Sequence, residues 1–229
     1  MSVYDLLFGD QPVEAMLLDA EFGGDPALVA ARARAWEGNP SEAANAVEGV
    51  DEPWASLVVA VARQSSGQSP KVQLRTVAED ATLDSRPRLW AWTALRKLGE
   101  KPGPIHASEV LGCIAEVPVD GDLDVLACYA DGSTRLLGQG GQCLATESSN
   151  GPSPEVEAVL AEAAALLPVA PAPRDPADPG PDPNGVRLWA LSARGLHRVD
   201  APWADVEQGG RFEKLFKALL ALFEKVASR

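Results

Sequence analysis

The sequence predicts an α+β fold, in which an N-terminal all-helical layer is followed by an antiparallel meander sheet with flanking helices. Up to about residue 100, apolar positions recur every three or four residues and the helix interiors are rich in alanine. After the Pro-Gly-Pro segment at 102–104, the apolar period becomes two. We therefore expect a helical domain over residues 1–103 and an α+β domain over residues 104–229.

Short helices separated by Gly, Pro and Asn are expected in the helical domain. The Asp-Glu-Pro segment at 51–53 opens a helix with one buried stripe, formed by Trp54, Leu57, Val58 and Val61. The strongest helix of this half follows residues 84–87 and ends at Gly99. No fixed repeat length recurs, so the pattern favours an irregular, helical repeat-like layer over a true solenoid.

Four strands of a meander are expected next. Their ranges are 110–119, 123–129, 133–137 and 142–146. Between the second and third strands, Asp131 and Gly132 predict a two-residue type I′ turn, because these residue types accept positive φ angles. The glycine-rich segment 138–141 joins the last two strands and is interpreted as a plain turn, since a phosphate-binding loop would link a strand to a helix.

The register set by this turn places apolar side chains on both faces of the sheet. Leu126 would pair with Leu137 on one face, and Ala127 with Leu136 on the other, where Thr134 would also lie. A half-exposed antiparallel sheet would instead be polar on one side. We therefore expect both faces to be covered, one by the two C-terminal helices and the other by the N-terminal half or a second protomer.

The last part of the chain adds a helix, a linker, a hairpin and a final helix. Ser153 and Pro154 are typical of a helix cap and a first helical residue. Residues 168–184 contain seven prolines and several aspartates, which predicts an exposed, mobile linker that a protease cuts first. A hairpin within 186–199 and a helix from about residue 212, with one apolar stripe, complete the fold.

Composition and charge limit the classes of partner. Twenty basic residues against 33 acidic ones give a net charge of −13, which disfavours nucleic acid and anionic membrane surfaces. The sequence contains neither a signal-peptide pattern nor an apolar run of about 20 residues, so we expect a cytoplasmic protein. Three cysteines without a Cys-x-x-Cys pair, each within an apolar strand pattern, are expected to be buried reduced thiols.

No catalytic, metal-binding or cofactor-binding pattern is recognisable. The two histidines, His106 and His197, have neither metal-ligand spacing nor a nucleophile motif nearby. The acidic turn at 120–124 resembles the start of a calcium loop, but Val125 and Asp131 stand where that loop needs Gly and Glu. The sequence therefore predicts no catalytic residue, no metal and no cofactor.

These observations favour a non-enzymatic protein-interaction module, such as an adaptor, a chaperone-like protein or a regulatory subunit. Trp203, in the predicted loop 200–210, is the best candidate for a partner-binding anchor, and His197 and Trp189 complete the predicted site. The partner would be another protein or a second copy in a homodimer. Two alternatives stay open, an enzyme whose site combines scattered acidic residues with His197 and a small-molecule sensor that uses the sheet face.

Two resemblances accompany this interpretation. Residues 110–117 and 123–133, with the Arg-Leu-Trp segment at 88–90 and the strand-Gly-Leu-His segment at 186–197, resemble a family of uncharacterised bacterial proteins over most of the chain. That family brings no activity with it. The element order of the C-terminal half resembles the type III secretion chaperone group and, less closely, profilin and roadblock-type modules, which implies a compact one-sheet fold.

Overall fold

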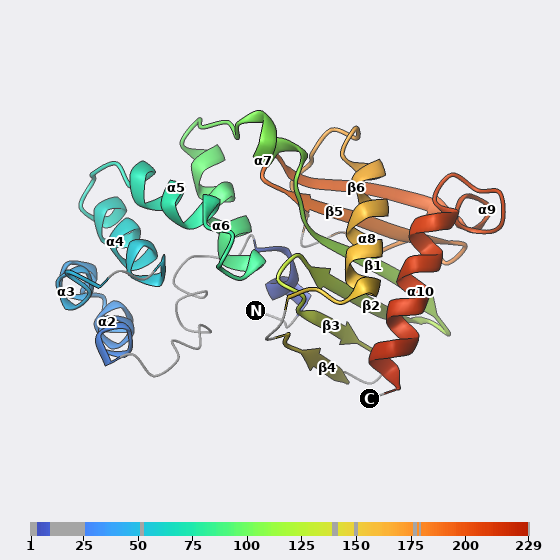
Figure 1. The fold of residues 1–229 in the computed structure, drawn as a ribbon, viewed down its shortest axis with the longest axis horizontal. Coiled ribbons are helices and arrows are strands. Elements are labelled where there is room, and N and C mark those ends of the chain that lie inside the picture. Colours follow the sequence, from blue (N-terminus) through green and yellow to red (C-terminus); the bar gives the residue numbers. More distant parts are fainter. Residues whose placement is uncertain are drawn as a thin grey trace. The chain divides into compact units, whose positions relative to one another are not determined.

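A computed structural model describes residues 4–9, 26–50, 53–138, 142–148, 151–175, 178 and 180–228. The chain divides into two compact units, an N-terminal unit over Met1–Lys101 and a C-terminal unit over Pro102–Arg229. Helices make up the described part of the first unit, and an antiparallel sheet with helices makes up the second (Figure 1). The chain therefore has the α+β fold that the sequence predicts.

The N-terminal unit is a succession of helices. They are η1 (Tyr4–Phe8), α2 (Pro26–Trp36), α3 (Pro40–Ala46), α4 (Pro53–Ser65), α5 (Lys71–Glu79) and α6 (Ser85–Lys97). From α2 to α6, each helix packs mainly against the next one in the sequence (Figure 1). Proline opens three of these helices, at a position where the missing amide hydrogen would have no intrahelical partner.

Apolar stripes on α4 and α6 form much of the core of this unit. On α4, Leu57, Val58 and Val61 are buried as the spacing predicts, and Trp54 is half-buried. On α6, the buried surface extends around the helix and includes Trp90 and Trp92. The helix surface in contact with the core is thus wider than a single stripe.

The described strands of the C-terminal unit form one antiparallel sheet. They are β1 (Val110–Val119), β2 (Asp122–Tyr129), β3 (Thr134–Leu137), β4 (Cys143–Thr146), β5 (Gly185–Ser192) and β6 (Gly195–Pro202). The strand order is β4-β3-β2-β1-β5-β6. A short helix, α7 (Pro104–Ser108), precedes β1. The meander and the hairpin expected from the sequence therefore join into one sheet, because β5 pairs with β1.

The prediction of a type I′ turn between β2 and β3 is wrong. The Gly132 amide donates to the carbonyl of Tyr129, and the Tyr129 amide donates to that of Ser133, which leaves a three-residue loop. Only Gly132 in this loop has a positive φ, 91°, as expected for a type I turn followed by a left-handed residue. Leu126 consequently pairs with Leu136, one residue away from the predicted register.

One face of the sheet packs against α8 (Pro154–Ala163) and α10 (Glu213–Ala227), as the sequence predicts, and is called the core face here (Figure 1). The sheet contributes Cys113, Ala115, Leu126, Cys128, Leu136, Leu188 and Ala190 to this core. The helices contribute Val156, Val159, Leu215, Leu219, Leu222 and Val226. On the opposite face, Ile114, Ala127 and Trp189 are also buried.

Two short helices connect these elements. η3 (Ala164–Leu166) extends α8, and α9 (Trp203–Val206) follows β6 directly, within a segment for which the sequence predicts a loop. The Ser153 side chain accepts a hydrogen bond from the Val156 amide, which confirms Ser153 as the cap of α8.

Candidate functional site

Strand β4 forms one edge of the sheet, and its outer side is accessible. Cys143, Leu144 and Ala145 are all exposed, and Leu144 has 48% of its surface in solvent. Within the described residues, β3 is the only strand that pairs with β4. Exposed edges are usually protected by charged residues or proline. The segment Cys143–Thr146 has neither, so its main protection is its short length.

The backbone of β4 presents hydrogen-bonding groups outward at two residues. The Gly138 amide donates to the Gln142 carbonyl at 2.9 Å, which makes these two residues a hydrogen-bonded pair. Bonded and non-bonded pairs alternate along an antiparallel ladder, so Leu144 bonds to β3 and the N–H and C=O groups of Cys143 and Ala145 face away from it. An extended segment from another chain can therefore pair with β4.

The opposite edge, β6, is flanked by the proline-rich segment, which we name the strap (the described residues of 168–184). The Ala172 amide donates to the carbonyl of Leu196 at 3.0 Å. The carbonyl of Val169 contacts His197, whose side chain lies on the core face. Although most of the strap is exposed, it joins η3 to β5 within one unit and bonds to β6. Its predicted mobility stays a prediction.

Arg187 on β5 anchors the strap to the face opposite the core. Its guanidinium lies 2.9 Å from the Asp178 carboxylate and donates to the Gly180 carbonyl at 2.8 Å, and both partners belong to the strap. It also lies 2.6 Å from Asp200 and 3.6 Å from Glu116. The Arg187 side chain is only 4% exposed, so its guanidinium is shielded from solvent, whereas the Asp200 side chain is 46% exposed.

Arg198 on β6 contacts the same two aspartates from the neighbouring strand. It forms ion pairs with Asp178 and Asp200, and its guanidinium stacks over Trp189 at 5.6 Å. Burial alone raises the pKa of Asp178, but hydrogen bonds from Arg198, the Gly180 amide and Arg187 lower it overall. The strap is therefore held by carboxylates that stay charged at neutral pH.

Of the three residues predicted to bind a partner, His197 and Trp189 are buried. His197 is 0% exposed, and its Nδ1 lies 2.6 Å from the Val169 carbonyl, so Nδ1 must donate the proton. Nε2 then accepts from the hydroxyl of Ser192 at 2.9 Å. Trp189 is 2% exposed and donates from Nε1 to Glu116. Both side chains are therefore buried and bonded within the C-terminal unit.

Trp203, the predicted anchor, is half-buried. Its ring packs edge-to-face against Phe216, with the centroids 5.8 Å apart, and both rings adjoin the core between the sheet and α10. The three predicted residues therefore do not form one surface site. Trp189 and His197 lie on opposite faces of the sheet, since Trp189 pairs with Arg198 and His197 pairs with Ala190.

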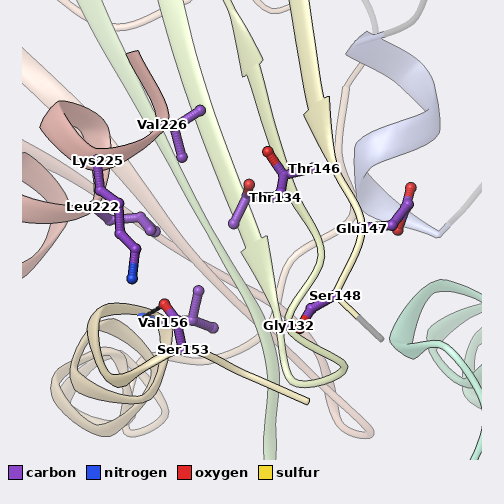
Figure 2. Close-up of a pocket in the computed structure, with 10 residues that line it drawn as sticks. All are labelled: Gly132, Thr134, Thr146, Glu147, Ser148, Ser153, Val156, Leu222, Lys225 and Val226. Atoms are coloured by element: carbon purple, nitrogen blue, oxygen red, sulfur yellow. Dashed lines mark hydrogen bonds between the residues drawn. The ribbon is translucent and has the colours of Figure 1, made fainter. Parts of the chain in front are cut away.

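A pocket of about 230 Å³ lies on the core face beside β4. Figure 2 shows Thr134 and Thr146, from β3 and β4, on one side of the pocket. On the other side it shows Ser153, the cap of α8, and Leu222 and Lys225 from α10. Ser148 adds a fourth hydroxyl to the lining. The pocket thus combines hydroxyl groups with an apolar part from the helices.

Thr134 is the unusual member of this lining. The residue is 3% exposed, and its hydroxyl has no hydrogen-bond partner among the described residues. Leaving a buried hydroxyl unsatisfied costs about 1–3 kcal/mol. A group that enters the pocket and bonds to this hydroxyl would remove that cost.

The cysteines differ in exposure, which corrects the expectation of three buried thiols. Cys113 and Cys128 pair across β1 and β2 and are buried, whereas Cys143 is exposed on the edge strand. Burial raises the pKa of the Cys128 thiol to about 12 and that of Cys113 well above its ordinary value. Both buried thiols are therefore protonated at neutral pH and are poor nucleophiles.

In the described ranges, no group of three or more His, Cys, Asp and Glu residues is arranged to hold a metal ion. Nor does any helix there have the length and apolarity needed to cross a membrane.

Comparison with known proteins gives no relative. The chain matches no protein-family model, no curated protein and no solved structure. The resemblance to uncharacterised bacterial proteins and the likeness in element order therefore stay predictions.

Proposed function

We propose that this protein is a non-enzymatic protein-interaction module, an adaptor, chaperone-like protein or regulatory subunit, that binds an extended segment of another protein along β4. The observation that carries the proposal is the contrast between the two edges of the sheet. The strap bonds to β6, whereas β4 presents the outward backbone groups of Cys143 and Ala145. Strand addition of this kind derives its affinity from main-chain hydrogen bonds.

The chemistry around β4 favours a partner segment that is apolar and either neutral or basic. Leu144 projects on the core face and is half-exposed, so an apolar side chain beside it would bury its surface. The net charge of −13 attracts basic segments and repels a second copy of the same chain. A pair of four-residue edge strands would also bury far less area than a stable dimer needs.

The geometry supports the enzyme alternative less well. That hypothesis depends on His197, but both of its ring nitrogens are hydrogen-bonded to protein groups and the side chain is buried. A general base must reach the proton that it removes. The small-molecule alternative is favoured by a specific observation, the pocket beside β4.

Selection of short random peptides by display on the full-length protein tests the proposal. The binding of a selected peptide should depend on the outward amide of Ala145. Ala145→Pro removes this amide without removing a hydrogen bond to β3, because proline is tolerated where an edge N–H faces solvent. We expect affinity for the peptide to fall at least about tenfold.

Ala145→Thr is the matched control, because it keeps the amide and has a high strand propensity. Binding of the selected peptide should survive in this variant. If Ala145→Pro binds the peptide as tightly as the original chain, the proposed site is wrong. If the protein alone forms a dimer that Ala145→Pro dissociates, the occupant of β4 is a second copy and the proposed partner is wrong.

A further inference from the structure

We propose that the pocket between β3, β4, α8 and α10 binds an uncharged group that both donates and accepts hydrogen bonds, such as a primary carboxamide. The inference is independent of strand addition at β4. It starts from Thr134, a residue that lines the pocket and whose buried hydroxyl has no hydrogen-bond partner among the described residues (Figure 2). A hydroxyl can donate one hydrogen bond and accept others, so it accommodates a ligand group of either polarity.

The charges around the pocket are already paired. Lys225 forms an ion pair with Glu155, and Arg135, which follows Thr134 in β3, forms one with Glu147. Hydrogen bonds from Lys225 and Ser153 lower the pKa of Glu155 to about 2, so the first of these pairs persists at neutral pH. A charged ligand would therefore enter without a free counter-charge, which is costly in a partly desolvated site.

The N-terminus of α8 does not offer free donors for an anion either. The Val156 amide donates to the Ser153 hydroxyl, and the Glu157 amide donates to the Ser153 carbonyl. The Glu155 amide is bonded to its own carboxylate, and Pro154 has no amide hydrogen. Anions usually bind at helix N-termini through free backbone amides, and this first turn offers none.

What the pocket offers is a set of neutral hydroxyls beside an apolar wall. Thr134 and Thr146 lie on adjacent strands as a directly opposed pair. Val156, Leu222 and Val226 line the helical side and suit the carbon atoms of a ligand. The ligand group can come from a free small amide or from an Asn or Gln side chain of a segment docked on β4, since Thr146 belongs to both β4 and the pocket.

Three probes of the same size and shape but different charge test this inference. Acetamide, acetate and acetamidinium are titrated into the isotopically labelled full-length protein, and the amide signals of Thr134, Thr146 and Ser153 are followed by NMR. We expect acetamide to shift these signals saturably and the two ions to bind at least about tenfold more weakly. Binding of either ion as tight as that of acetamide, or no shift with acetamide, would overturn the proposal.

Thr134→Val provides the matched variant, because it replaces only the hydroxyl by a methyl group. Acetamide should bind roughly tenfold more weakly to this variant. Its melting temperature should stay the same or rise, because the lost hydroxyl had no partner. Ser153→Ala should instead lower the melting temperature, because that hydroxyl caps α8. Unchanged acetamide affinity in Thr134→Val would contradict the inference.

Competition distinguishes the two sources of the ligand group. A β4-binding peptide that displaces acetamide identifies an Asn or Gln side chain as the natural occupant. Simultaneous binding of peptide and acetamide identifies a free small molecule. Both results support an uncharged ligand, and acetamide should bind to Ala145→Pro as well as to the original chain. Failure of peptide binding at β4 would leave the acetamide result intact, so the two proposals fail separately.

Discussion

The ion network around Arg187 leads to a quantitative prediction about stability. Arg187 is 4% exposed and contacts Asp178, Asp200 and Glu116, from the strap and two strands. Arg187→Met keeps most of the aliphatic volume but removes the buried positive charge. Breaking a buried ion pair in this way costs about 3–5 kcal/mol. We therefore expect the melting temperature, followed by circular dichroism, to fall by roughly 6–20 °C.

Comparing Arg187→Met with Arg198→Met isolates the effect of burial on the loss of stability. Arg198 contacts the same two aspartates, but its side chain is 29% exposed, so its ion pairs are screened by solvent. The Arg198→Met substitution should lower the free energy of unfolding by about 1 kcal/mol or less. A double variant of Arg187→Met with Asp178→Asn should cost less than the sum of the two single changes, because the residues are in contact. Equal losses for Arg187→Met and Arg198→Met would refute the assignment of a buried, strap-holding role to Arg187.

Two further predictions concern thiols and acid. Ellman's reagent should react rapidly with Cys143 alone in the folded protein and with all three cysteines in denaturant. Rapid reaction of Cys113 or Cys128 in the folded protein would contradict the assigned burial. Because the pKa of Asp178 is lowered in the folded state, its contribution to stability is present above the unfolded pKa and is lost as the pH falls below about 4. The protection factors of the strap amides, which correct for the slower intrinsic exchange in acid, should then fall, and Asp178→Asn should show low protection already at neutral pH.

Local patterns were sufficient to predict most elements of the fold. The cap at Ser153, the ten-residue strand β1 and the apolar stripe of α10 each depend on neighbouring residues in the sequence, and all three are present. The joining of the β5–β6 hairpin to β1 is a pairing between distant segments, which no local period encodes. From the sequence, the aspartates of residues 168–184 predict a hydrated segment. In the structure, one of them, Asp178, instead forms an ion pair with the buried Arg187.

The sequence does not reveal the candidate site, for a related reason. A one-residue change in the β2–β3 loop moves Thr134 from the predicted face to the core face, beside Cys128 and the pocket. The sequence carried a usable signal for β4, since the strand Cys143–Thr146 lacks the charges and proline that protect most edges. The position of β4 at the edge, however, depends on strand order. The sequence favours Trp203, His197 and Trp189 instead, and the burial of His197 and Trp189 depends on the fold.

Amide hydrogen exchange on β4 tests the central claim most directly. In the free protein, the outward amides of Cys143 and Ala145 should exchange rapidly, whereas those of Leu144 and Thr146, bonded to β3, should exchange slowly. With a selected peptide bound, strand addition predicts that Cys143 and Ala145 become protected. Rapid exchange at both residues in the saturated complex would show that the peptide binds elsewhere and would contradict the proposed interaction surface.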